Sequence, residues 1–229
     1  MLFESGIITR GSGSLGGLTL SHNRAGMYLR SRVTPVNPGT GQQVAVRNAF
    51  SGLSTAWQQT LTKPQRDAWT TYAINVPVTG KLGNPLTLTG QQMYIRCNTP
   101  RIQAGLPRVD DGPIVFAHDS LAAVTVAAFD AADMVTLTFD DTDLWLNEDD
   151  AALLLYVSRQ QASSINFFKG PYRYAGKLDG DSVAPPATPG SIANTYEQDA
   201  GNAIFARLFT SRADGRLSPV QHHGPVAIA

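Results

Sequence analysis

The spacing of apolar residues changes near residue 110 of this 229-residue chain. Before that point, Val46, Phe50, Leu53, Trp57 and Leu61 recur at steps of four, three, four and four, which predicts one apolar stripe on a helix. Beyond Gly112, apolar residues form short alternating or continuous runs bounded by Asp, Gly, Pro and Asn. Such runs are typical of strands. The chain is therefore predicted to be an α+β protein.

The C-terminal half contains seven such runs in about 115 residues, a density typical of an antiparallel sandwich. The runs are Ile114 to Ala117, Ala123 to Phe129, Met134 to Phe139, Ala152 to Val157, Tyr172 to Lys177, Ala203 to Phe209 and Leu217 to Val220. We expect an immunoglobulin- or fibronectin-like β-sandwich over residues 111–229, preceded over residues 1–110 by an arm, a hairpin and a small helical segment.

Three helix starts carry the T-x-x-Q spacing of a capping box, in which the two side chains satisfy free amides of the first turn. They are Thr40 to Gln43, Thr62 to Gln65 and Thr89 to Gln92. Pro100 is expected to interrupt the third helix. Two helices joined by a short turn also suggest a helix-turn-helix DNA reader, but Trp69 and Tyr72 occupy its second helix and are expected in the core. A DNA-contacting accessory role stays open, through non-specific phosphate contact.

The N-terminal segment is rich in glycine and is expected to be mobile until a partner orders it, over about the first 17 residues. Gly11, Gly13 and Gly16 match G-x-G-x-x-G, but no preceding buried strand, following helix or nearby acid supports a dinucleotide site. A hairpin is predicted from Leu18–Ser21 and Met27–Val33. Its candidate partner-binding residues are Arg24, Tyr28, Arg30 and Arg32.

The net charge of zero conceals a separation of charge. Residues 1–108 hold eleven Lys or Arg and two acids, a net charge of +9, whereas residues 109–229 carry −9. Residues 130–150 alone contain eight carboxylates and no Lys or Arg. Opposite charges favour association between copies or with a partner. The candidate acidic partner-binding residues are Asp141, Asp143, Asp149 and Asp150.

Calcium is an alternative for the acidic segment, because Asp141 and Asp143 open with the alternate spacing of oxygen ligands. Trp145 and Leu146 then replace a ligand and the required glycine. The single cysteine, Cys97, and four scattered histidines give no recognisable metal or catalytic set. No enzyme, cofactor, metal or small-molecule substrate is therefore expected. The sequence also lacks an apolar run of membrane-spanning length, and no secretion signal is expected.

One resemblance bears on function. The segment Arg32-Val-Thr-Pro-Val-Asn-Pro38, followed by Gln43, Val46-Arg47, Phe50, Leu53-Ser54, Trp57, Leu61-Thr62, Gln65-Arg66 and Ala68-Trp69, resembles a module in uncharacterised proteins of tailed bacteriophages and prophages. Lys169-Gly-Pro-Tyr-Arg173 and Arg212-Ala-Asp-Gly-Arg-Leu-Ser218 resemble segments of the same proteins.

The resemblance implies a structural virion component, made in the host bacterial cytoplasm and built into the particle. A capsid cement or decoration protein, contacting capsid proteins and other copies of itself, is the leading expectation. A tail or connector (neck) protein is the nearest alternative. A third candidate is an outward β-module that binds host glycans through Trp145, Tyr172 and Tyr174.

Overall fold

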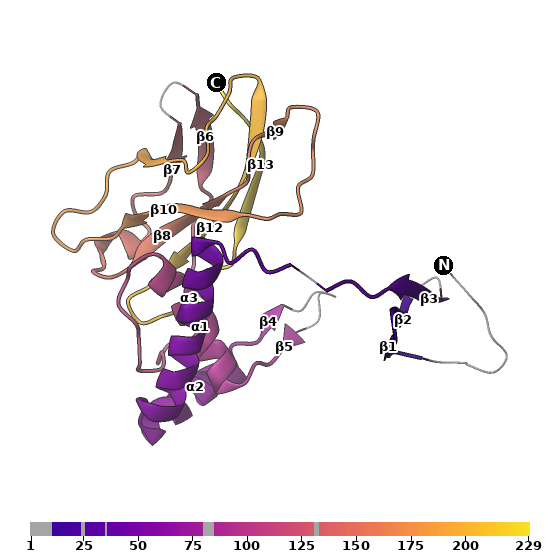
Figure 1. Cartoon of the computed structure of the whole chain (residues 1–229). Coiled ribbons are helices and arrows are strands. Elements are labelled where there is room, and N and C mark those ends of the chain that lie inside the picture. The colour runs from indigo at the N-terminus through magenta and orange to yellow at the C-terminus, as the bar shows by residue number, and fades with distance from the viewer. Residues whose placement is uncertain (1–10, 24–25, 35, 80–84, 131–132) are drawn as a thin grey trace. The chain divides into compact units, whose positions relative to one another are not determined.

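The computed structural model describes residues 11–23, 26–34, 36–79, 85–130 and 133–229 (Figure 1). It confirms a mixed α+β fold, with helices and antiparallel sheets. Contacts divide the chain into two compact units, Met1–Gly41 and Gln42–Ala229, which are considered separately. The expected boundary at 110/111 lies inside the second unit.

The first unit contains an antiparallel sheet in the order β1-β2-β3. Its strands are β1 (Gly13–Leu15), β2 (Leu18–Asn23) and β3 (Gly26–Ser31). The tight turn between β1 and β2 is possible because Gly16 has φ +57°, a conformation that L side chains rarely adopt. The expected hairpin is thus present, with an additional strand made from the glycine-rich segment.

The second unit begins with the helices α1 (Gly41–Gln59), α2 (Lys63–Asn75) and α3 (Gly90–Gln103). Each begins one residue after a threonine of a predicted capping box. At α3 the box is reciprocal: the Gln92 amide donates to Thr89 Oγ1 at 3.3 Å, and the Thr89 amide donates to Gln92 Oε1 at 3.0 Å. A short ribbon of β4 (Val78–Thr79) and β5 (Pro85–Leu86) separates α2 from α3.

The helices enclose an aromatic core. Trp69 contacts Tyr72 and Tyr94 edge-on, with ring centroids 6.0 and 5.6 Å apart. All three side chains are buried, which confirms Trp69 and Tyr72 as core residues. A recognition helix needs an exposed reading face, so these positions do not support sequence-specific DNA binding by α2.

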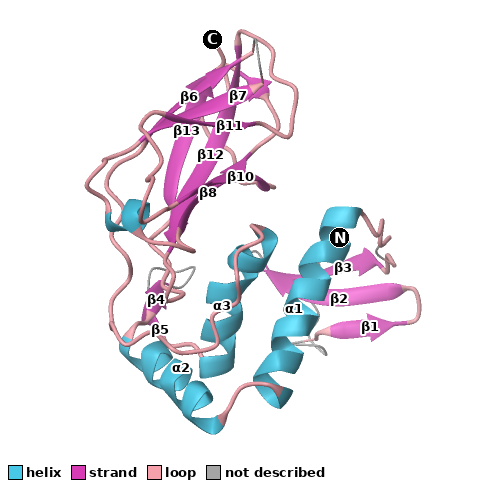
Figure 2. Ribbon diagram, turned by 90° about the vertical axis from the view of Figure 1, so that its left-hand side faces the viewer, coloured by secondary structure: helices cyan, strands magenta, loops and turns pink. Residues whose placement is uncertain are grey.

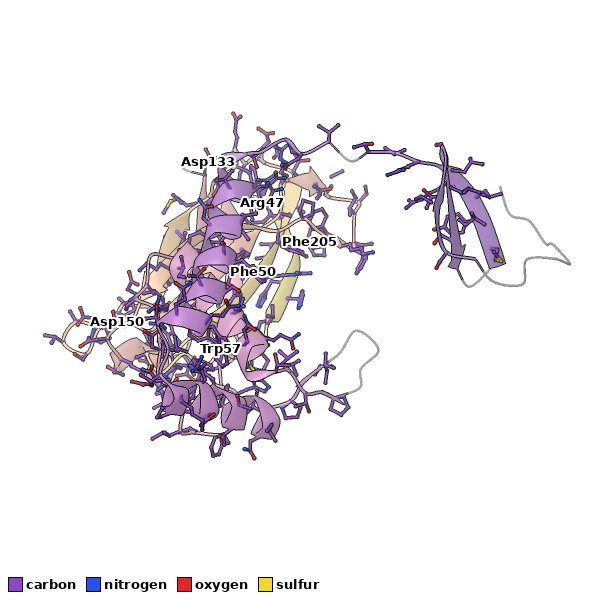
Figure 3. The ribbon with its side chains drawn as sticks, turned by 60° about the horizontal axis from the view of Figure 1, so that its bottom comes forward. Arg47, Phe50, Trp57, Asp133, Asp150 and Phe205 are labelled. Atoms are coloured by element: carbon purple, nitrogen blue, oxygen red, sulfur yellow. The ribbon has the colours of Figure 1, made fainter. Side chains whose placement is uncertain are left out.

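The predicted stripe of α1 is buried only in its second half. Leu53 is 1% exposed, whereas Val46 and Phe50 are 42% and 56% exposed. Figure 3 shows Arg47, Phe50 and Trp57 on successive parts of this helix. The first half of α1 consequently presents side chains to solvent, against the sequence expectation of one continuous buried stripe.

Pro100 does not end α3, which continues to Gln103. A proline inside a helix lacks the amide that would bond one turn back, but the helix can persist where tertiary packing holds it. Pro100 is buried. Gly105, just beyond the helix, has φ +72° and turns the chain away.

The segment after α3 is fixed to the helices by side-chain hydrogen bonds. Trp69 Nε1 donates to the Asp110 carbonyl at 2.9 Å, and Tyr94 Oη donates to Asp110 Oδ1 at 3.1 Å. Buried Asn98 accepts from the Val109 amide at 2.8 Å and donates to its carbonyl at 3.0 Å. The change of charge and periodicity near residue 110 therefore coincides with an anchored connection.

Two sheets follow, with the helices gathered at one end of the strands (Figure 2). One has the order β11-β7-β6 and the other β10-β8-β12-β13, with the short β9 paired to β12. The strands are β6 (Thr125–Phe129), β7 (Met134–Thr138), β8 (Ala152–Val157), β9 (Gln161–Ala162), β10 (Arg173–Asp179), β11 (Gly190–Ala193), β12 (Asn202–Ser211) and β13 (Gln221–Ala227).

The inner faces of both sheets share one hydrophobic core. Val135 and Leu137 of β7 pack in the same cluster as Leu153 and Leu155 of β8 and Leu208 of β12. The alternate β8 residues, Ala152 and Leu154, pack instead against Ala104 and Leu106 beyond α3. β8 is thus buried on both faces, which explains its uninterrupted apolar sequence.

Several strand predictions were wrong at the margins. Residues 114–117 form no strand, and Ile114 is 89% exposed because nothing among the described residues covers this connection. The last strand begins at Gln221 rather than at Leu217. Strand β11 was missed because Ile192 is its one large apolar residue.

Candidate interaction surfaces

The N-terminal sheet has one apolar and one polar face. Directly paired residues of an antiparallel sheet lie on the same face, so the pairs Leu15↔Leu18 and Leu20↔Leu29 define the apolar face. Met27 lies on it as well by alternation along β3. Leu15 is 78% and Leu18 49% exposed.

The polar face carries the candidate residues of this unit. Thr19 pairs with Arg30 and Ser21 with Tyr28, so Tyr28 lies with Arg30 and opposite to the leucines. Arg32 follows β3, and its amide donates to the Gly17 carbonyl at 2.8 Å. Arg24 and the first ten residues of the expected mobile arm lie outside the described residues.

No described residue of the first unit is buried. Its backbone is paired as a sheet, but its leucines have not been removed from water by other residues of the unit. The glycines of the G-x-G-x-x-G motif lie at Gly11, in β1 and in the β1–β2 turn, with no helix opening after them. A dinucleotide site needs that helix N-terminus for the pyrophosphate, so the motif has a turn-forming role.

The acidic segment is largely occupied by internal contacts. Asp143 accepts from the Ala122 amide at 3.3 Å, and Asp149 accepts from the Ser182 amide at 2.9 Å and from its hydroxyl at 3.0 Å. Burial raises the pKa of Asp143 above its ordinary value, against the lowering effect of the Ala122 amide. These two candidate residues close loops of the sandwich.

Glu148 belongs to a buried cluster around Arg212. Arg212 pairs with Glu148 and, at 2.8 Å, with Asp119 Oδ1. Thr210 Oγ1 donates to the other Asp119 oxygen at 2.6 Å. Hydrogen bonds from the two carboxylates raise the pKa of Arg212, while burial opposes that rise. This cluster fixes the acidic segment against the end of β12.

Asp141 and Asp150 are exposed and make no hydrogen bond or ion pair among the described residues. Asp150 has φ +62° and Asp133 has φ +48°, and both are labelled in Figure 3. The structure thus separates the four acidic candidates into two that are bonded within the fold and two that remain available to a partner.

Metal and glycan alternatives receive little support from the geometry. Within the described part of the chain, no group of three or more His, Cys, Asp or Glu side chains is placed to hold a metal ion. Trp145 is 0% exposed and packs on Phe139 in the sandwich core, so it cannot serve as a glycan platform. Cys97 is buried among the helices, and burial raises the pKa of its thiol to about 12.

A row of side chains on the outer face of the larger sheet was missed by sequence reasoning. The registers pair Tyr174 with Tyr156, Tyr156 with Arg207, and Arg207 with His222, so the four lie across β10, β8, β12 and β13. Tyr156 Oη donates to Gln103 Oε1 at 2.9 Å. The row depends on strand register, which residue types alone do not reveal.

The row lies in two adjoining hollows between the sheet and the helices, which share Gln103, Tyr156 and Tyr172. One encloses about 530 Å³ and includes Arg47 and Arg173, and the other encloses about 890 Å³.

Comparison with known proteins finds no matching family model, no matching curated sequence and no matching solved structure. Among the described helices, none is long and apolar enough to cross a membrane.

Proposed function

We propose that the protein is a non-enzymatic structural component of a tailed-phage virion, which attaches to the particle through its N-terminal sheet. Within this proposal its location is the capsid, where it cements or decorates neighbouring subunits. The family resemblance of the helical segment motivates the virion setting. The observation that carries attachment is the sheet of residues 13–31, which has an exposed apolar face and contains no buried described residue.

The energetic argument starts from the cost of order. Two- or three-stranded sheets of this size are marginal in water unless they bury a hydrophobic face. Burying a leucine side chain is worth about 1.5–3 kcal/mol. Leu15, Leu18 and Leu20 together therefore offer about 5–9 kcal/mol to a surface that covers them. Their present exposure makes a docking partner the natural source of that energy.

The body of the protein supports the same proposal. Called A to G in order, its main strands form the sheets A-B-E and C-F-G, with β10 added beside the third strand. A constant-type immunoglobulin sandwich has A-B-E-D opposite C-F-G, so only the place of the fourth strand differs. We infer an immunoglobulin- or fibronectin-like sandwich, a type of domain often used for binding and assembly.

An incorporation assay tests the proposal. Particles released from cells carrying the encoding genome are purified, and the chain is quantified in them by mass spectrometry. Replacement of Leu15 and Leu18 by Ser is expected to abolish incorporation while the melting temperature of residues 42–229 stays unchanged. Leu144→Ser is the matched control, because Leu144 is 65% exposed in the other unit. Normal incorporation of the double variant would contradict attachment through this face.

Copy number separates the capsid from the alternatives. We expect the large copy number of a shell component, whereas a tail or connector protein would be present in about six or twelve copies. Absence from particles would reject the virion role. Salt-sensitive retardation of random DNA, lost on reversal of Arg30 and Arg32 to Glu, would favour the DNA-contacting alternative instead.

A further inference from the structure

We propose that the two adjoining hollows between the helices and the larger sheet form one basic groove that binds an extended acidic segment of a partner protein. This inference goes beyond the proposed function, because the groove lies wholly within residues 42–229 and does not involve the N-terminal sheet.

The lining of the groove has one sign of charge. Its cationic side chains are Arg47, Arg96, Arg173, Arg207 and His222, and none of its described lining residues is Asp or Glu. They come from α1, α3, β10, β12 and β13, which are separated in sequence. A cleft lined by a single sign of charge concentrates the field and attracts oppositely charged ligands.

These arginines differ from others in the chain. Arg108, Arg212 and Arg216 each pair with a carboxylate. Arg96 and Arg207, by contrast, form no ion pair with any described residue. In a chain that holds as many acids as bases, this leaves the charge of the groove uncompensated.

Arg207 is held in position at the centre of the groove. Its guanidinium carbon lies 3.9 Å from the centroid of the Tyr172 ring, and its Nε is buried without a hydrogen-bond partner. Beside it, His222 is directly opposite in register. Burial and the neighbouring Arg207 charge lower the pKa of His222. A planar guanidinium fixed by stacking is well suited to bidentate contact with a carboxylate.

The ring contacts favour a peptide over single-stranded nucleic acid. Proteins that bind single strands offer open aromatic faces on which bases stack. Here Arg207 covers one face of Tyr172, and Tyr156 stacks on Phe209 with the ring centroids 5.5 Å apart. The groove therefore presents guanidinium groups to a ligand, and the rings support them.

Fluorescence anisotropy with the full chain tests the groove. The probes are a labelled Glu-Ser repeat peptide, the matched Gln-Ser peptide and an oligothymidylate with the same number of charges. The Glu-Ser peptide is expected to bind most tightly, with an affinity that falls as salt screens the charges. The Gln-Ser peptide is expected not to bind. Equal binding of the two peptides, or no binding by either, would overturn the proposal.

The double variant R96Q/R207Q is expected to bind the Glu-Ser peptide at least about tenfold more weakly, because each lost charge-assisted contact is worth a sizeable part of that factor. The control K63Q/R66Q removes the same charge from α2, outside the groove, and is expected to bind normally. R96Q alone removes an exposed side chain and guards against misfolding of the double variant.

An equal loss in both double variants would refute a specific groove. Tighter binding of oligothymidylate than of the peptide, lost in R96Q/R207Q, would overturn the peptide assignment in favour of nucleic acid. Neither result bears on the Leu15 and Leu18 incorporation assay, so the two proposals fail independently.

Discussion

Arg101 provides a quantitative test that the helices and the sheets of residues 42–229 unfold together. Its side chain is 0% exposed. Its Nε donates to the Pro107 carbonyl at 2.9 Å, and one terminal nitrogen donates to Ser211 Oγ at 3.1 Å and to the Arg212 carbonyl at 2.6 Å. One side chain thus joins α3 to the loop after it and to the end of β12.

Arg101→Met retains a long side chain but leaves these three acceptors without their donor. Each unsatisfied buried acceptor costs about 1–1.5 kcal/mol, or about 3–4.5 kcal/mol in total. Burial lowers the pKa of Arg101, which shows that the charged form is itself penalised and that its removal returns part of this energy. A net loss of about 3 kcal/mol corresponds to a melting temperature about 6–12 °C lower for a unit of this size.

Differential scanning calorimetry is the assay, with Arg108→Met as the matched control. Arg108 is bound to Asp110 at 2.6 and 2.7 Å but its side chain is 34% exposed, so its loss should cost less than about 1 kcal/mol. The wild-type unit is expected to melt in one transition. Two separate transitions, or equal melting temperatures of the two variants, would refute the linkage through Arg101.

Three further predictions concern local features. Gly90→Ala should destabilise the protein by about 1–3 kcal/mol in urea unfolding, because a Cβ there would lie 2.9 Å from the Thr70 backbone. Asp149→Ala should cost about 1–2 kcal/mol through its two lost hydrogen bonds, whereas Asp141→Ala should cost less than about 0.5 kcal/mol; equal losses would contradict the division of the acidic segment. Burial lowers the pKa of His223 below 6.5, so its stabilising effect is complete above that pH and is lost as the pH falls; His223→Gln should flatten the decline in stability between about pH 7 and 5.

The elements with strong local signals could be predicted from the sequence. The threonine–glutamine pairs marked all three described helix starts, and the apolar runs of β6, β7, β8, β10 and β12 gave their approximate positions. Ile114 to Ala117 was misleading because an apolar run does not reveal whether another element covers it. β11 was hidden because its pairing with β7, rather than its own composition, makes it a strand.

The interaction surfaces were less accessible to sequence reasoning. The acids of residues 130–150 looked equivalent, but tertiary contacts bind Asp143 and Asp149 and leave Asp141 and Asp150 exposed. Arg101 counted as one more surface charge until its burial was known. The basic groove combines residues brought together by strand register and helix packing, which a charge count along the chain cannot show.

Hydrogen–deuterium exchange tests the central claim most directly, with the full chain alone and then bound to particles that lack it. In the free chain, the amides of β2 and β3 should exchange rapidly despite their pairing, because no described residue of that unit is buried. On binding, the account predicts strong protection of β1, β2 and β3. Failure to bind, or protection confined to residues 42–229, would contradict attachment through the N-terminal sheet.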